Sequence, residues 1–390
     1  MNLENDVSDR ISTGILFISY AEYPGAFGLS KRIEGLRSTL SNHGIQSAVM
    51  CPTTRVAKAR DVVDLGLPLF RTLTNSSLGR MIALLLFSLI AIPAIVGSSL
   101  RSRFMIQYES LYSAFPALVA KILLRKKIIG DEVILMSRET KSPLRYVLYA
   151  FDRFLIRMTD YVITSSTSAE VLIRKWFPKK PVYLVMNGVE PVKRRDRPAS
   201  RDRHELVFVG SLSSPENRVA IENVLRLAEL LERKGIEFHI TVVGGPWSYA
   251  APYLGENMVR RGRVTFKGAI KGSELFEVYS TASVGLLPFF MPSGGGQKIK
   301  ALEYLAHQLL VLSGPFGFGN LPGIVPGVHY LEAANVAEMS EWAVDFVSHP
   351  AAYSQIAEAG RRLVEQQFSW EVTSKPYLEI LSAIESQKGG

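Results

Sequence analysis

The chain has 390 residues, enough for two domains of roughly 150–200 residues, and its 47% hydrophobic content describes a folded globular protein. One cysteine, Cys51, excludes a disulfide framework and a thiolate zinc cluster, so a reducing cytoplasmic setting fits best. The net charge of +9 predicts an anionic partner, but no arginine-rich arm or zinc-finger spacing occurs, which disfavours nucleic acid over anionic lipid or a phosphorylated small molecule.

The first half of the chain alternates continuously apolar stretches with helical patterns. The polar start lacks an apolar core, so we expect no secretory signal there. GILFISY at residues 14–20 reads as a strand, and the apolar spacing that follows predicts a helix closed by Gly44. Further strands are expected at 46–53, 104–110, 126–133 and 161–166. Such alternation predicts a parallel sheet covered on both faces.

One segment, residues 81–100 (MIALLLFSLIAIPAIVGSSL), carries no charge and is flanked by Arg80, Arg101 and Arg103. Its length would just span a bilayer at about 1.5 Å per residue. A buried core helix is a second interpretation. We favour a third, a helix on the membrane surface whose flanking arginines contact anionic head groups.

The second half repeats the alternation after a polar, charged stretch at 191–205, which is the best linker in the chain. Strands are expected at 205–210, 238–245, 264–268, 283–290 and 309–314, and helices throughout 336–386. The fold class is therefore α/β, with two doubly wound, Rossmann-like domains. Ligands bind beyond the carboxyl ends of such strands, and we expect the site in a cleft between the domains.

A glycine-rich stretch, PSGGGQKIKALEYLAHQLLVLSG at residues 292–314, is the strongest candidate for phosphate binding. It is not a P-loop, because Lys298 follows glutamine and no Ser or Thr comes after it. Residues 314–323 also miss the GxGxxG fingerprint, since Pro322 stands at its third glycine. No D-x-D or H-E-x-x-H occurs, and the histidines show no metal-ligand spacing, so we expect no metal.

Four motifs carry a resemblance to a known family: VITSS…VYLVMNGVE, LVFVGSLSSPENR, VTFKGAI and PSGGGQKIKALEYLA. In this order they resemble the GT-B glycosyltransferases, most closely family 4, which transfers sugars from nucleotide-sugar donors. The resemblance implies an acceptor-binding domain at 1–195 and a donor-binding domain at 204–368. It also implies a C-terminal helix at 369–390 that packs back on the N-terminal domain.

The resemblance also implies donor contacts at particular residues. The turn from Gly25 to Gly28 would approach the donor, and Gly210 would open a loop whose basic residues grip the diphosphate. Backbone groups from Gly268 onward would contact the nucleobase, and Glu303 would hold the ribose hydroxyls.

Elementary chemistry agrees with a diphosphate at the glycine-rich stretch. Gly295 and Gly296 would let the backbone come close, and the following helix would direct N–H groups at the anion. Lys298 and Lys300 would add positive charge where a metal is otherwise needed. Lys300 and Glu303 share a helix face, so we slightly favour Lys300 for the phosphate, although a solvated basic helix start is an alternative.

The chain departs from the family pattern at several positions. The family has two glutamates eight positions apart, and the first falls on Gly295. Ser211 stands where an arginine usually follows the strand glycine, and Arg218 is the nearby substitute for a lysine. His43 is the sole histidine of the N-terminal domain and sits at a helix end, so the usual active-site histidine is missing.

Two carboxylates are candidates for the acceptor step. Asp131 and Glu132 follow a strand, so one of them could accept the acceptor's proton in an inverting transfer. Capping or ion pairing is an equally valid interpretation. Glu109 and Glu22 are weaker candidates. A retaining transfer needs no protein base, because the donor phosphate can take the proton and leaving-group stabilisation dominates.

The leading hypothesis is a metal-independent glycosyltransferase without cofactor, peripheral or monotopic on the cytoplasmic membrane face. Its partners would be a nucleotide sugar, an anionic membrane surface contacted through segment 81–100, and a lipid-linked or surface-polysaccharide acceptor. Alternatives are a non-catalytic GT-B scaffold and a sugar-nucleotide epimerase, the latter disfavoured by the scarcity of histidine.

Overall fold

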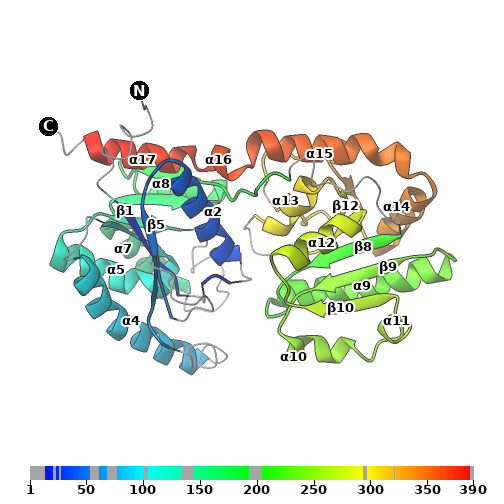
Figure 1. Ribbon diagram of the computed structural model, residues 1–390, viewed down its shortest axis with the longest axis horizontal. Helices are drawn as coiled ribbons and strands as arrows, with labels where there is room; N and C mark the ends of the chain where they lie inside the picture. Colours follow the sequence, from blue (N-terminus) through cyan, green and yellow to red (C-terminus); the bar gives the residue numbers. More distant parts are fainter. Residues whose placement is uncertain are drawn as a thin grey trace. The chain divides into compact units, whose positions relative to one another are not determined.

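The computed structural model describes residues 14–20, 23–25, 28–52, 61–67, 77–99, 104–132, 145–192, 204–292, 297–319 and 321–386. The chain forms two compact units (Figure 1). The first comprises Met1–Met186 with Thr373–Gly390, and the second Asn187–Val372. From the sequence we expected the boundaries at 195–204 and 368–369. The sequence shows only where the apolar periodicity stops, whereas the units are divided where residues begin to contact the other unit's residues instead.

The first unit contains a parallel sheet in which the described strands follow the order β3-β2-β1-β4-β5-β6-β7. Adjacent strands pair in parallel throughout. The chain adds strands on one side of β1 and then returns to add β4 on the other, which confirms the predicted doubly wound order. The strands are β1 (Gly14–Ile18), β2 (Ser47–Cys51), β3 (Val62–Asp64), β4 (Phe104–Glu109), β5 (Ile128–Asp131), β6 (Tyr161–Thr164) and β7 (Val182–Leu184).

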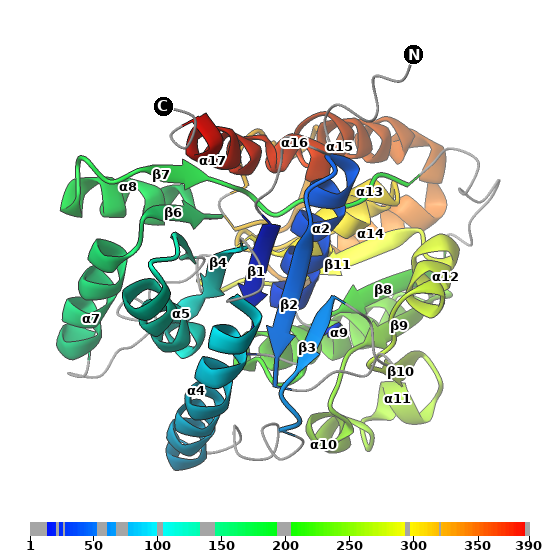
Figure 2. The same cartoon turned by 60° about the vertical axis from the view of Figure 1, so that its left-hand side comes forward.

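Helices cover both faces of this sheet. Its helices are α2 (Gly28–Asn42), α4 (Ser77–Ser99), α5 (Ser110–Leu124), α7 (Arg145–Met158), α8 (Thr167–Trp176) and α17 (Lys375–Ser386). Ile106 and Tyr108 of β4 pack in a buried cluster with residues of α4, α5 and α7. Figure 2 shows these three helices together on one side of the strands. Gln107 points to the opposite face, because side chains alternate along a strand, and there it bonds to Tyr377 of α17.

The C-terminal helix α17 belongs to the first unit because of its apolar stripe. Tyr377, Ile380, Leu381 and Ile384 recur at helical spacing, and all four are buried. Short helix α16 (Trp370–Thr373) precedes it at the boundary between the units.

The apolar segment at 81–100 forms most of α4, which packs against α5. Phe87, Ala91 and Ile95 are buried in the core, whereas Leu86 and Leu89 on another face are 40% and 67% exposed. The core-helix interpretation therefore describes the buried face of α4, and the surface interpretation describes its exposed face. Within the described residues, no helix has the length and apolarity needed to cross a membrane. The side chains of Arg80, Arg101 and Arg103 lie outside the described part.

The second unit repeats the doubly wound design with the strand order β10-β9-β8-β11-β12-β13, again paired in parallel. The strands are β8 (Glu205–Val209), β9 (His239–Val243), β10 (Val264–Gly268), β11 (Val284–Leu287), β12 (Leu310–Ser313) and β13 (Leu331–Glu332). Its longer helices are α9 (Pro215–Arg233), α12 (Ser273–Thr281), α13 (Ile299–Ala306), α14 (Val336–Ser348) and α15 (Ser354–Gln367); short turns are α10 (Trp247–Ala250), α11 (Asn257–Arg260), η2 (Ala251–Tyr253) and η3 (Pro350–Tyr353).

Candidate active site

The topology of the second unit places a ligand site where β8 and β11 run side by side. The chain goes outward from β8 to β9 and β10, then crosses back to β11 on the other side of β8. The loops leaving these two strands therefore diverge, which is the usual place for a ligand in a doubly wound sheet. Gly210 follows β8, Phe289 follows β11, and α13 begins nearby at Ile299.

Helix α13 is anchored against the end of β8. Its residues Ala301, Leu302, Tyr304 and Leu305 are buried. The Tyr304 hydroxyl accepts a hydrogen bond of 2.8 Å from the backbone N–H of Val209. This fixes the helix start close to the loop after β8 and leaves Lys300 and Glu303 half-buried on the remaining face.

Lys300 lies next to Gly210, the glycine that follows β8. Its ammonium donates to Asn217 Oδ1 at 2.7 Å and lies over the rings of Phe208 and Phe289, at 4.7 and 4.9 Å from their centroids. A Cβ at Gly210 would approach Lys300 Nζ to 2.8 Å and Asn217 Cγ to 2.8 Å. A side chain at this position would therefore have to displace the Lys300–Asn217 pair.

Lys298 stands at the N-cap position of α13 and is buried. Its ammonium donates to Glu216 Oε2 at 3.2 Å and lies 4.3 Å from the centroid of Phe289. Both lysines thus share one aromatic ring, and Glu216 is the carboxylate that partly offsets their charge.

The Lys300 ammonium is enclosed although part of the residue is exposed. Burial, followed by the charge of Lys298, lowers its pKa from 10.5 to about 7, although Glu216 and Glu303 act in the opposite direction. Holding a lysine near its titration point costs free energy in the unliganded protein. An anion brought to this position would restore the charged form, so the arrangement suits a phosphate ligand.

Glu303 is held by a tyrosine one helix away. The Tyr279 hydroxyl donates to Glu303 Oε2 at 2.7 Å, and burial, followed by the Glu303 charge, raises the pKa of Tyr279 well above 10. The hydroxyl therefore stays a donor and orients the carboxylate. Its predicted contact with ribose hydroxyls stays a prediction.

The loop after Gly210 is braced by its own residues. Arg218 donates to the carbonyls of Leu212 and Ser213 at 2.9 and 3.1 Å and lies over the Tyr249 ring. Asn217 Nδ2 donates to the Ser211 carbonyl at 2.8 Å. Arg218 supports the loop in this structure, and its predicted diphosphate contact stays a prediction, as does that of Ser211.

At the expected nucleobase position, Gly268 adopts a φ of +69°. A Cβ there would meet Trp247 Nε1 at 2.9 Å. Trp247 is 53% exposed and offers a flat ring beside the backbone after β10. Sequence reasoning missed Trp247 and Asn217. Neither left a signal in the sequence, because the burial of Asn217 and its contact with Lys300 are seen only in the structure.

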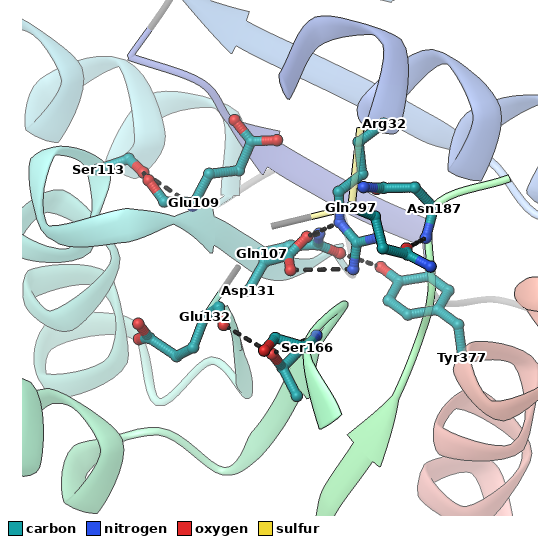
Figure 3. A network of polar contacts seen from close by, with 11 residues as sticks. Arg32, Gln107, Glu109, Ser113, Asp131, Glu132, Ser166, Asn187, Gln297 and Tyr377 are labelled. Carbon is teal, nitrogen blue, oxygen red and sulfur yellow. Dashed lines mark hydrogen bonds and ion pairs between the residues drawn. The ribbon is translucent and has the colours of Figure 1, made fainter. Parts of the chain in front are cut away.

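In the first unit, Asp131 forms a buried, bidentate ion pair with Arg32. Arg32 Nε and Nη2 donate to the two carboxylate oxygens at 2.8 and 3.0 Å (Figure 3). Gln107 Nε2 adds a bond of 3.1 Å, and the Tyr377 hydroxyl donates to Gln107 Oε1. The chain of contacts links α2, β4, β5 and α17. Asp131 therefore has a structural task, and its catalytic role stays a prediction.

Glu132 is buried beside that pair and is bonded to the Tyr108 hydroxyl at 3.1 Å. Burial, followed by the charge of Asp152, raises the pKa of Glu132 to about 8. Glu109 is also buried, and burial followed by the charge of Asp131 raises its pKa well above 4.5. Figure 3 shows the Glu109 carboxyl pointing away from Asp131. At neutral pH, below its pKa of about 8, Glu132 is mostly protonated.

Glu132→Gln is expected to remove a pH-dependent loss of stability. The folded-state pKa of about 8 lies above 4.5, so the wild type loses stability as the pH rises between these values, whereas glutamine stays neutral. The thermal midpoint of the variant should therefore exceed that of the wild type by more above pH 8 than near pH 5. An equal difference at both pH values would contradict this. Loss of sugar transfer with stability retained would assign Glu132 to the acceptor step.

The remaining predicted residues are less informative. The Gly25 N–H donates to Ser30 Oγ at 2.6 Å, and Gly28 is the first residue of α2. Gly295, Gly296 and Glu22 lie outside the described residues. Over the described ranges, no three His, Cys, Asp or Glu side chains gather as metal ligands.

Comparison with known proteins agrees with this geometry. The family described as Glycosyl transferases group 1 matches residues 203–348, which lie within the second unit. No curated protein sequence matches the chain. Three solved structures illustrate the fold similarity.

Sucrose-phosphate synthase from Thermosynechococcus elongatus has a TM-score of 0.70 at 17% identity and covers 96% of this chain and 100% of its own. HepE from Anabaena, solved with UDP-glucose, scores 0.67 at 14% identity, covering 95% and 99%. WaaG, a glycosyltransferase involved in lipopolysaccharide biosynthesis, scores 0.66 at 15% identity, covering 94% and 99%.

The fold and the matched domain together define the class of protein. The whole chain has the two-unit architecture of GT-B glycosyltransferases, and residues 203–348 of its second unit match the glycosyltransferase group 1 family. The expected enzyme class is thereby confirmed.

Proposed function

We propose that the protein transfers a sugar from a nucleoside diphosphate sugar to a lipid-linked or surface-polysaccharide acceptor at the cytoplasmic membrane face. The observation that carries the donor assignment is the enclosed ammonium of Lys300, which is bonded to Asn217 next to Gly210 at the carboxyl end of β8. HepE, which shares the fold, was solved with UDP and with UDP-glucose, so UDP is the first nucleotide to test.

In the proposed reaction the acceptor hydroxyl attacks the anomeric carbon while the bond to the diphosphate breaks. The departing diphosphate takes the electron pair and gains negative charge, and the hydroxyl proton passes to a diphosphate oxygen in a retaining transfer or to a protein carboxylate in an inverting one. Lys300 and Lys298 stabilise that charge in a site partly closed to water, where electrostatic interactions are strong. They supply the charge that a divalent cation would otherwise bring, so we propose that transfer proceeds without metal or cofactor.

Two features support the acceptor and the location. WaaG, another protein of this fold, is involved in lipopolysaccharide biosynthesis. Helix α4 exposes Leu86 and Leu89 on one face while Phe87, Ala91 and Ile95 anchor the other in the core. An anchored helix with an apolar outer face suits attachment to the membrane surface.

The donor assignment is tested by calorimetry of purified protein with UDP, GDP and ADP in the presence of EDTA. We expect one of the three to bind with a dissociation constant in the micromolar range, and the corresponding nucleotide sugars to be hydrolysed or transferred when membrane lipid extract is added. Absence of binding by all three would contradict the proposal. Binding without turnover for any sugar or acceptor would favour the non-catalytic scaffold.

A further inference from the structure

Helix α7 carries an apolar surface that the described part of the chain leaves uncovered. Tyr146 and Val147 are 66% and 64% exposed, and Phe151 and Phe154 are also exposed. Only its second half is anchored, through the buried Leu155 and Ile156. Water is an unfavourable environment for such a helix turn, so an exposed apolar surface of this kind marks an interaction site.

Beside this surface, α7 and α8 enclose an open groove of about 620 Å³. Three cations line it, Arg145, Arg153 and Lys175, together with the rings of Tyr146, Tyr149 and Trp176. Leu172 completes the lining, and among the described residues no carboxylate belongs to it.

The aromatic rings hold the arginines in place without neutralising them. Arg153 lies over the rings of Tyr149, Trp176 and Phe177, at 5.5–5.7 Å from their centroids, and donates to the Tyr149 hydroxyl at 3.2 Å. Arg145 lies 4.8 Å from the Tyr146 centroid. A guanidinium oriented by rings keeps its charge and most of its N–H donors for an incoming anion.

Asp152, the residue before Arg153, is buried, and its charge acts on Glu132 inside the unit. The next acidic residues along the chain are engaged in ion pairs. Glu170 pairs with Arg174, and Asp160 pairs with Lys121 at 3.0 Å and with Lys127. Within the described residues, no ion pair to a carboxylate involves Arg145, Arg153 or Lys175. Within the part of the chain that the structure describes, the groove therefore carries positive charge that no ion pair offsets, next to an apolar surface.

We propose that this groove and the adjoining surface of α7 dock on an anionic phospholipid bilayer. Lipid phosphates would bind Arg145, Arg153 and Lys175, while Tyr146, Val147 and Phe151 enter the interfacial layer. The combination of aromatic rings, arginines and apolar side chains is the one that membrane interfaces favour. The proposal names a second contact for the membrane location of the proposed function, and donor binding plays no part in it.

The pairing of charge and apolar surface favours a bilayer over a soluble phosphate. A free phosphate would neutralise the cations but leave Val147 and Phe151 in water, whereas a bilayer covers both. A protein partner is excluded by the test if vesicles of pure lipid bind with the expected composition dependence.

The first experiment is sedimentation of the full chain with mixed phosphatidylcholine–phosphatidylglycerol vesicles. Each cation near the surface contributes about fivefold in affinity. Arg145→Gln/Arg153→Gln/Lys175→Gln should therefore weaken binding by about a hundredfold. The charge-matched control, Arg226→Gln/Arg233→Gln/Arg260→Gln, alters exposed arginines of the second unit and should leave binding within about fivefold of wild type.

The contribution of the apolar surface of α7 is tested by Tyr146→Ser/Val147→Ser, which should weaken vesicle binding at least tenfold. Val325→Ser/Val328→Ser is the matched control. Val325 and Val328 are 45% and 49% exposed on the second unit. A separate Leu86→Ser/Leu89→Ser variant addresses α4. If only that variant lost binding, the groove proposal would be overturned while the role of α4 stood.

Trp176 allows the same test on a protein without groove substitutions. Its fluorescence should be quenched by brominated phosphatidylglycerol vesicles and unchanged by inorganic phosphate, and Trp176→Phe should remove the quenching. Equal response to pure phosphatidylcholine, or a response to inorganic phosphate alone, would overturn the proposal. UDP binding, measured on the same samples, reports separately on the donor site.

Discussion

Lys300→Met is expected to reduce the affinity for the nucleoside diphosphate by roughly ten- to a hundredfold. Charge-assisted hydrogen bonds contribute about 1.5–3 kcal/mol, and about 1.4 kcal/mol is a factor of ten. Methionine fills a similar volume between Phe208 and Phe289. It also removes an ammonium group whose pKa is lowered to about 7, mainly by burial. The thermal midpoint should therefore not fall while donor binding is lost. Calorimetry and thermal unfolding of the same preparation measure both quantities.

The wild type should show a matching pH dependence. Only the protonated ammonium attracts the diphosphate, and in the unliganded protein the pKa of Lys300 is about 7. The protonated fraction falls about tenfold between one pH unit below the pKa and one unit above it. Affinity should decrease by up to that factor over this range, and the dependence should vanish in Lys300→Met.

Lys234→Met is the matched control for this substitution. Lys234 lies at the far end of α9 in the same unit, where it pairs with Glu341. The Lys234→Met variant should bind the donor with the same affinity and the same pH dependence as the wild type. Unchanged affinity in Lys300→Met would contradict the assignment of this lysine and direct attention to Lys298.

Much of the fold could be predicted because buried parallel strands are apolar along their whole length. The stretches at 14–20, 205–210 and 309–314 all contain observed strands. Strands β3 and β13 were missed. Both are short edge strands of three and two residues, too brief for an apolar run to stand out from loop sequence.

The candidate site was predictable where motif and chemistry coincide. Lys300 and Glu303 were recognised from one helix start, and the structure gives each a defined partner there. Contacts between distant segments could not be predicted. Lys300 beside Asn217, and Arg32 beside Asp131, come from segments far apart in the chain that only the fold brings together, and neither pair leaves a pattern in the sequence.

Removing the guanidinium of Arg32 is expected to have the largest effect on the stability of the first unit. Arg32→Leu would leave the Asp131 carboxylate buried without its partner, and breaking a buried ion pair on one side costs about 3–5 kcal/mol. Asp131→Asn should cost a similar amount, because Arg32 is then the unpaired charge. Urea unfolding monitored by circular dichroism measures both, and UDP binding reports whether the second unit remains folded.

Two comparisons show whether the ion pair itself is responsible. Arg174→Leu removes a half-exposed arginine paired with Glu170 in the same unit, and exposed pairs contribute below about 1 kcal/mol. Arg32→Leu/Asp131→Leu replaces both charges with apolar groups and should recover part of the lost stability, since neither charge is left alone.

The same variants decide between the two roles of Asp131. If the residue is structural, sugar transfer by Asp131→Asn should fall in proportion to the unfolded fraction, and activity should return on cooling below the lowered midpoint. Full stability with transfer abolished at every temperature would instead make Asp131 the base of the acceptor step. The bidentate pair with Arg32 and the added bond from Gln107 favour the first outcome, because all three contacts require the carboxylate to stay where it is.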